Sequence, residues 1–502
     1  MSTTRAPYRP EDLTFQYDRT ALLKRLRQAL PRPEQVIDDA EGLRPYECDG
    51  LAAYRQLPVA VAIPDTVEQA QAVLAACHEL GVPVTARGAG TSLSAGSLPH
   101  PQGIILSLAR FNRILAIDPQ RRTARVQPGV RNLAVSEAAR PYGLYYAPDP
   151  SSQIACSIGG NVAENAGGVH CLKYGLTVHN VLSATVLTPE GEQVVLGGDA
   201  LDAPGYDLMA LYTGSEGMLG VVVEATVRLL PEPVHKDVLL AAFPTVESGG
   251  HAVAALIAAG IIPAGLEMMD GPAIQAAEDF VQAGYPTDAA AILIGEFDGT
   301  PDEVAEEIER VTALLREHGA NEVRVAADAD EQARFWAGRK NAFPAVGRIS
   351  PDYYCMDGTI PRHKLAEVLT GIEALSREYG LRVVNVFHAG DGNLHPLVLY
   401  DGNVPGEFEQ TEALGQRILE LCVDAGGTVT GEHGVGLEKI NAMCHQFSRE
   451  ELDQFHAVKA AFDAAGTLNP GKAVPTLRRC REFRTLPASG SAEQSQPEPE
   501  QL

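Results

Sequence analysis

Two histidines and a Glu–His pair in the second half of the chain are the residues best suited to catalysis. The segment NVFHAGDGNLHPLVLY places His388 at the end of an expected strand and His395 seven residues later, after a glycine-rich turn. Further along, GGTVTGEHGVGLEK carries Glu432 and His433 in an expected strand-to-loop setting. Two imidazoles and a carboxylate with one open position form the ligand set of a catalytic divalent metal. A bare pair of histidines is more often made up of ordinary core or surface residues, but the glycine-rich loops that surround these two favour a metal site.

Three glycine-rich segments in the first half suit a phosphorylated ligand. The first, PVTARGAGTSLSAG, spans residues 83–96 and follows an expected strand; the others are PDPSSQIACSIGGNVAENAGGVHCLKYG, residues 148–175, and YTGSEGMLGVVVEATVRLLP, residues 212–231. Glycines let backbone N–H groups approach an anion, and hydroxyl side chains add donors, so such loops can hold a pyrophosphate. One such segment alone also fits a tight turn. Three together are more than ordinary surface loops would supply.

Two regions of regular structure must position these motifs. Residues 58–231 alternate β-branched strands such as GIILSL with helices such as TVEQAQAVLAACHELG, which is typical of an α+β domain. Residues 234–475 contain long helical patterns, such as TPDEVAEEIERVTALLREHG, between strands such as LRVVNVFHAG. This second pattern predicts an antiparallel sheet covered by helices.

At 502 residues the chain is longer than one hydrophobic core usually supports, so we expect several domains. Residues 1–52 form a lead-in with one short amphipathic helix, a proline break and a turn. Residues 53–232 form the first domain and residues 233–475 the second. The polar tail, residues 476–502, is expected to be disordered because it has too few apolar groups to offset its ordering entropy.

The composition argues against several classes of protein. A formal net charge of −25 without any block of lysine and arginine makes nucleic acid a poor partner. The eight cysteines lack CxxC spacing, which argues against a zinc ribbon or a cysteine-bound iron–sulfur cluster, and we expect them to be buried free thiols. Apolar runs are too short for a transmembrane helix, and no signal-peptide pattern opens the chain, so we expect a cytoplasmic protein.

The glycine-rich segments resemble the FAD-binding domain of the vanillyl-alcohol oxidase and p-cresol methylhydroxylase (PCMH) superfamily, over about residues 53–231. The resemblance implies an α+β fold with a two-lobed PCMH-type FAD-binding domain. It also implies noncovalent FAD, since residues 83–96 lack the histidine through which some members attach the flavin. The positions that match FAD contacts, with Asn469 from the later TLNPGK segment, are Arg87, Gly88, Gly90, Thr91, Ser92, Gly96, Pro148, Ser157, Gly160, Asn161, Gly167, Gly168, Val222 and Asn469.

With the His/Glu motifs included, residues 53–472 are similar to the FAD-linked 2-hydroxy-acid dehydrogenases, a family that contains D-lactate and D-2-hydroxyglutarate dehydrogenases and the FAD subunit of bacterial glycolate oxidase. In this family the residues matching His388, His395 and Glu432 bind zinc or a similar divalent metal, and the residue matching His433 is the base. The resemblance therefore implies oxidation of a small 2-hydroxy acid, with hydride transfer from the α-carbon to flavin N5.

A carboxylate substrate needs a fork-shaped donor, which Arg339 or Arg348 could provide, and the resemblance favours Arg339. Cys355 falls where members that oxidise a longer diacid carry a lysine, which favours glycolate or D-lactate. Three alternatives remain open: a stand-alone D-lactate or D-2-hydroxyglutarate dehydrogenase, an electron-relay subunit with no substrate site of its own, and a metal hydrolase. Likeness to glycolate oxidase implies companion subunits, one of them an iron–sulfur protein, at the inner face of the membrane.

Overall fold

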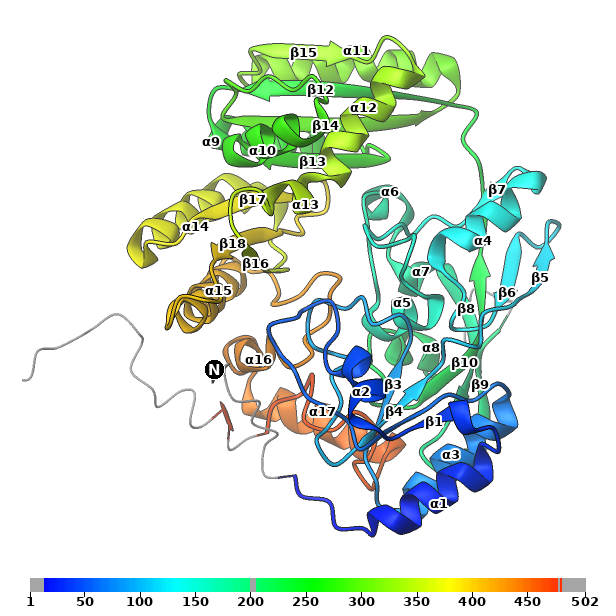
Figure 1. Cartoon of the computed structure of the whole chain (residues 1–502). Coiled ribbons are helices and arrows are strands. Elements are labelled where there is room, and N and C mark those ends of the chain that lie inside the picture. The colour runs from blue at the N-terminus through cyan, green and yellow to red at the C-terminus, as the bar shows by residue number, and fades with distance from the viewer. Residues whose placement is uncertain (1–12, 199–204, 477–478, 481–502) are drawn as a thin grey trace, which may run out of the picture.

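The computed structural model describes residues 13–198, 205–476 and 479–480. The predicted disordered tail therefore lies outside the described residues, except for Thr476, Arg479 and Cys480. The blue-to-green first half and the green-to-yellow sheet of the second half occupy separate parts of the molecule (Figure 1). Among the described helices, none is both long enough and apolar enough to cross a membrane.

The first sheet carries the first glycine-rich loop at one strand end. Its strands are β1 (Val36–Ile37), β2 (Ala60–Ala62), β3 (Val84–Arg87) and β4 (Ile104–Ser107), in the order β1-β2-β4-β3, with β4 parallel to both β2 and β3. The lead-in supplies α1 (Arg19–Ala29), α2 (Ala40–Leu43) and the 3-10 turns at Pro33–Gln35 and Arg44–Tyr46. Helix α3 (Val67–Leu80) begins where the Thr66 side chain accepts from Gln69 N and ends at Gly81, whose φ is 67°.

The second sheet is antiparallel. Its strands and the short elements around it contain the other two glycine-rich segments. It contains β5 (Ile114–Asp118), β6 (Thr123–Val126), β8 (Val181–Leu187), β9 (Gln193–Gly197) and β10 (Val221–Arg228), in the order β5-β6-β10-β8-β9. Short elements surround it: α4 (Asn132–Ala139), a 3-10 turn (Arg140–Tyr142), β7 (Leu144–Tyr145), α5 (Ile158–Glu164), α6 (Cys171–Tyr174), α7 (Thr177–Asn180), α8 (Leu208–Tyr212) and β11 (Leu230–Pro231). Apolar residues of α4 and α5 pack on its inner face.

The large sheet of the second half is antiparallel throughout, in the order β15-β12-β14-β13-β17-β18-β16. Its strands are β12 (His235–Phe243), β13 (Gly265–Asp270), β14 (Ala291–Gly299), β15 (Glu322–Val325), β16 (Asp352–Cys355), β17 (Val383–His388) and β18 (Pro396–Tyr400). Its helices are α9 (Val246–Ala258), α10 (Gly271–Val281), α11 (Pro301–Glu317), α12 (Ala329–Lys340), α13 (Ala342–Val346), α14 (Leu365–Tyr379), preceded by a 3-10 turn (Arg362–Lys364), and α15 (Glu407–Asp424).

Helices cover both faces of this sheet, which confirms the predicted helix-covered antiparallel sheet. Along β12, Leu239 and Ala241 join the core under α9, α11 and α14, whereas Val238 and Leu240 join the core under α10, α12 and α13. This alternation follows from the two-residue period of a strand. Helix α11 begins at a capping box formed by Thr300 and Glu303 of its TPDE sequence.

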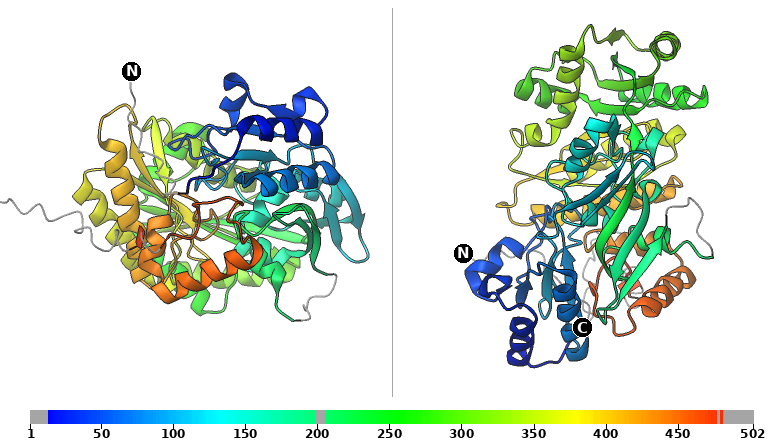
Figure 2. Two further views of the ribbon diagram at one scale, coloured as in Figure 1. Left: turned by 90° about the horizontal axis from the view of Figure 1, so that it is seen from below. Right: turned by 90° about the vertical axis from the view of Figure 1, so that its right-hand side faces the viewer.

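Helix α17 and the segment just after it return to the first half. After α16 (Ile440–Gln446) and α17 (Arg449–Phe462), Leu468 pairs with Val84 of β3, and Lys459 Nζ donates to Met218 O at 2.6 Å. Figures 1 and 2 show the orange α17 beside the blue and green elements of the first half. The boundaries at residues 53, 233 and 475 stay predictions. The two halves also contact each other elsewhere, for example where Lys173 Nζ donates to Asp298 O at 3.0 Å.

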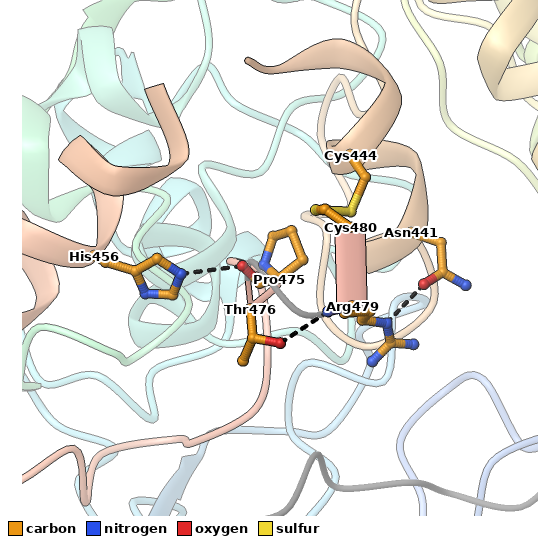
Figure 3. The surroundings of a disulfide bond; sticks show 7 residues. All are labelled: Asn441, Cys444, His456, Pro475, Thr476, Arg479 and Cys480. Carbon is orange, nitrogen blue, oxygen red and sulfur yellow. Dashed lines mark hydrogen bonds between the residues drawn. A yellow bond between two sulfur atoms is a disulfide. The ribbon is translucent and has the colours of Figure 1, made fainter. Parts of the chain in front are cut away.

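One expectation about the cysteines is wrong. Cys444 of α16 and Cys480 are joined in a disulfide (Figure 3), whereas Cys48, Cys77, Cys156, Cys171, Cys355 and Cys422 are free. The chain after α17 folds back over α16, where Arg479 Nε donates to Asn441 Oδ1, and this path brings together two sulfurs 36 residues apart in sequence. The spacing of the cysteines in the sequence does not indicate that the chain returns to α16.

Candidate active site

A cavity of about 400 Å³ lies between the glycine-rich loops of the first half and the His/Glu motifs of the second. The predicted site residues on its wall are Arg87, Gly88, Gly90, Thr91, Ser92, Gly96, Ser157, Gly160, Asn161, Val222, His395, Glu432 and His433. Residues far apart in sequence therefore share one space. Lys340 and Phe343 of the α12–α13 region also line it, and they were not predicted.

The loop after β3 is packed too tightly for larger residues. A Cβ atom on Gly88 would lie 2.2 Å from Ser157 Oγ. Gly90 has a φ of 71°, and a Cβ atom there would lie 2.2 Å from Arg87 Nη2. Arg87 in turn donates through Nη1 to Cys48 O at 2.8 Å. The glycines thus let the loop lie against Arg87 and Ser157, which leaves its backbone close to the cavity.

Three buried hydroxyl groups on this wall support the fit of a polar cofactor. The hydroxyls of Ser157, Tyr212 and Ser215 have no hydrogen-bond partner among the described residues. Because buried polar groups are normally paired, a ligand with several oxygen and nitrogen atoms would satisfy them. The residues present therefore fit FAD, with its pyrophosphate and ring system.

Four predicted FAD contacts do not line the cavity but shape its wall. Asn469 Nδ2 donates to Gly96 O at 3.0 Å and to Glu216 O at 2.7 Å, so it supports the glycine-rich loop from behind. Pro148 O accepts from the Asn132 side chain, and Gly168 lies against Asp149. A Cβ atom on Gly167 would lie 2.6 Å from Glu432 Oε2. Direct contact of Pro148, Gly167, Gly168 and Asn469 with FAD stays a prediction.

His388, His395 and Glu432 converge. His388 ends β17, and His395 immediately precedes β18. Glu432 lies in the loop between α15 and α16, where the predicted strand is reduced to an isolated bridge between Thr428 and Thr359. Glu432 Oε1 is 3.2 Å from His388 Nε2 and 2.9 Å from His395 Nε2. One ligand atom from each residue lies within 4.8 Å of the others.

This donor set fits a divalent metal. Both histidines present Nε2 to the same carboxylate oxygen, while Nδ1 of His388 contacts Glu267 at 2.7 Å and Nδ1 of His395 lies 3.4 Å from Met356 O. Glu432 Oε2 is buried without a partner among the described residues. Burial would raise the pKa of Glu432, but the two imidazoles outweigh it and lower the pKa well below its usual value. An ionised carboxylate and two imidazoles are typical zinc or manganese ligands.

Asp357 holds the loop that carries Glu432 and His433. Its buried carboxylate accepts from Gly431 N, Glu432 N and His433 N at 3.1, 3.2 and 2.9 Å. Burial lowers the pKa of His433 to about 4, so its imidazole is neutral at physiological pH. His433 Nδ1 has no partner among the described residues. A neutral imidazole on the cavity wall with an unpaired ring nitrogen can accept a proton.

The two candidate arginines differ sharply. Arg348 is exposed and donates to Asp279 O, away from the cavity. Arg339 is buried, and its Nε atom donates to Glu267 Oε2 at 2.6 Å. Arg339 does not line the cavity, but Glu267 connects it to His388. Its role in binding substrate stays a prediction.

Sequence reasoning missed the supporting carboxylates. Asp357, Glu267 and Glu216 are buried, and Glu216 accepts from Val435 N and Gly436 N at 2.7 Å each. Glu267 could have been noticed, because it is a charged residue inside the otherwise apolar strand GLEMM. A buried carboxylate in a strand interior needs a partner, which is a signal of structural or functional constraint.

Comparison with known proteins agrees with this geometry. Residues 58–197 match the FAD binding domain family, and residues 232–473 match the C-terminal domain of FAD linked oxidases. The chain is 64% identical to the glycolate oxidase subunit GlcD of Escherichia coli strain K12 over 93% of this chain and 94% of that protein. It is 32% identical to the D-lactate dehydrogenase of Anaerostipes hadrus over 91% and 98% of the two chains.

The fold is shared with solved structures of much lower identity. The structure of p-cresol methylhydroxylase with substrate bound is 18% identical and superimposes with a TM-score of 0.77 over 91% of this chain and 97% of that one. This likeness confirms the predicted α+β architecture with a PCMH-type FAD-binding domain. From the two domain matches and the extent of identity, the chain belongs to the FAD-linked oxidase family, whose members are oxidoreductases.

Proposed function

We propose that this protein oxidises a small 2-hydroxy acid, with glycolate as the preferred substrate and glyoxylate as the product. The observation that carries the proposal is that the glycine-rich loops and His395, Glu432 and His433 line the same cavity. High identity to a glycolate oxidase subunit over most of both chains supports glycolate. The relative named D-lactate dehydrogenase makes D-lactate the second candidate.

In this proposal His388, His395 and Glu432 hold a divalent metal, zinc being the first choice, and His433 is the base. When bound, the metal would supply polarisation of the substrate hydroxyl. Noncovalent FAD would supply the acceptor for two electrons. His433 takes the hydroxyl proton, and the α-hydrogen leaves with its electron pair as a hydride, so the C–O bond becomes a carbonyl. Arg339 is the proposed partner of the substrate carboxylate.

We also propose that the protein works with companion subunits that remove electrons from the flavin, one of them carrying iron–sulfur centres. The Escherichia coli relative is a subunit of glycolate oxidase, and this supports an assembly. Among the described residues, the groups of side chains that could hold a metal ion contain at most one cysteine each, whereas an iron–sulfur cluster is usually bound by several.

Anaerobic bleaching of the flavin tests the proposed reaction. The purified protein is mixed with glycolate, D-lactate, L-lactate or D-2-hydroxyglutarate, each with and without a chelator. We expect glycolate to bleach fastest and chelator to abolish bleaching. Bleaching by none of the four acids would contradict the proposed reaction, and chelator-resistant bleaching would contradict the role of the metal.

A further inference from the structure

Glu267 is a fully buried carboxylate that joins two parts of the proposed site. It lies in β13, directly opposite His388 of β17 in the antiparallel register. Its Oε1 atom is 2.7 Å from His388 Nδ1, and its Oε2 atom accepts from Arg339 Nε at 2.6 Å. One carboxylate therefore contacts both a candidate metal ligand and the candidate substrate-binding arginine.

The contact with His388 determines which ring nitrogen is available. An ionised carboxylate only accepts hydrogen bonds, so the proton of a neutral His388 ring resides on Nδ1. The lone pair is then on Nε2, which lies 3.2 Å from Glu432 Oε1. Register across the sheet and the short hydrogen bond thus place Nε2 beside the other two ligand atoms.

The contact with Arg339 fixes a guanidinium that has unused donors. The Arg339 guanidinium is the counter-ion of Glu267, with side-chain exposures of 3% and 0%. Arg339 Nη2 is buried and has no partner among the described residues. A buried, unpaired guanidinium nitrogen would be satisfied by an anionic ligand.

We propose that Glu267 is a positioning residue that aligns His388 for metal binding and Arg339 for the substrate carboxylate, so that one buried side chain couples the two binding events. This inference rests on the proposed function. We expect loss of Glu267 to weaken the binding of both the metal and the substrate, although in this proposal Glu267 contacts neither of them.

The test is Glu267→Gln, which keeps the shape and removes the charge. The amide has one accepting oxygen, so if that oxygen remains with Arg339 Nε, its NH₂ group faces His388 Nδ1 and drives the ring proton to Nε2. We expect metal affinity, measured by Zn²⁺ competition with a chromophoric chelator, to fall about 10–100-fold. KM for glycolate should rise more than kcat falls. Glu267→Asp keeps two accepting oxygens and should restore part of both properties.

Glu296→Gln is the matched control. Glu296 is also a buried glutamate, lies on the neighbouring strand β14, and accepts from Trp336 Nε1 of α12, the helix that carries Arg339. General loosening of α12 by a lost buried carboxylate would therefore appear in both variants. We expect Glu296→Gln to keep wild-type metal affinity and KM.

The outcomes separate the two proposals. Wild-type metal affinity and KM in Glu267→Gln, or equal losses in Glu296→Gln, would overturn the role of Glu267. If Glu267→Gln does not fold, the comparison is made with Glu267→Asp, in which unchanged metal affinity and an unchanged ratio of kcat to KM would overturn it. A wild-type flavin that no hydroxy acid bleaches contradicts the proposed reaction instead, and the Zn²⁺ titration still decides whether Glu267 orients His388.

Discussion

The imidazole rings of His395 and His433 are stacked, with centroids 4.9 Å apart and planes 9° from parallel. His395 precedes a strand of the large sheet, whereas His433 lies on the loop between α15 and α16. A proposed metal ligand and the proposed base are thus held side by side by two separate segments. This arrangement makes their roles separable by mutation.

Replacing His433 with alanine should leave FAD and metal bound but remove the base. We expect flavin reduction by glycolate to slow by about 10²–10⁴-fold, the usual contribution of general base catalysis. Stopped-flow spectroscopy under anaerobic conditions measures this rate. His445→Ala is the control, because His445 pairs with Asp424 outside the cavity. Unchanged reduction in His433→Ala would refute its assignment as base.

Replacing Glu432 with glutamine should remove the metal while the flavin remains. The loss of one anionic ligand from a site with two neutral imidazoles weakens binding of a divalent cation. Metal analysis of the purified variant should show less than stoichiometric metal, and added Zn²⁺ or Mn²⁺ should restore little activity. Wild-type protein treated with chelator and then resupplied with metal serves as the reference. Full metal content in Glu432→Gln would rule out this ligand set.

Replacing Gly90 with alanine should release FAD. Both Gly90 and Gly81 have positive φ angles, 71° and 67°, but a Cβ atom at Gly90 would meet Arg87, whereas Gly81 has open space. Each alanine variant should lose about 1 kcal/mol of unfolding free energy from backbone strain. Only Gly90→Ala should also lose flavin absorbance after gel filtration. Equal flavin content in the two variants would argue against pyrophosphate binding by this loop.

His170 should make the stability of the protein depend on pH in the alkaline range. Burial would lower its pKa, but ion pairs with Asp149 and Glu296 outweigh that effect and raise the pKa to about 10, from 6.5 in the unfolded chain. The folded form then keeps a proton that the unfolded form loses. The stabilisation is complete below pH 6.5 and disappears as the pH rises through about 10, with a slope of up to about 1.4 kcal/mol per pH unit.

The measurement is urea unfolding at several pH values between 6 and 10, with His170→Gln as comparison. In the variant, the free energy of unfolding should fall less steeply as the pH rises, because the contribution of His170 is absent. Parallel curves for the two proteins would show that His170 is not held protonated by Asp149 and Glu296.

Sequence reasoning predicted most where the residues concerned share one short segment. Glycine spacing around Gly88 and Gly90 predicted a tight loop, and the motifs at residues 388–395 and 432–433 predicted three metal ligands and a base, roles that stay predictions. Alternating apolar residues predicted the helix-covered sheet. In each of these cases the signal lies within a few residues, because it reflects local geometry.

The sequence was insufficient where partners meet across the fold. Glu267 contacts Arg339 and His388 from 72 and 121 residues away, and no spacing rule connects them. The disulfide between Cys444 and Cys480 depends on the path of the last segment. Asp357, which supports the Glu432 loop, appears in the sequence only as one more acidic residue among 65 aspartates and glutamates.

The return of the segment at Leu468 to β3 makes the wall of the proposed flavin site depend on residues made at very different times during synthesis. Asn469, whose side chain supports the loop at Gly96 and the backbone at Glu216, follows Gly96 by 373 residues. A ribosome-bound chain therefore lacks this support until Asn469 has been synthesised. We expect chains that stop before this segment to hold FAD less well, because nothing then supports the loop at Gly96 from behind.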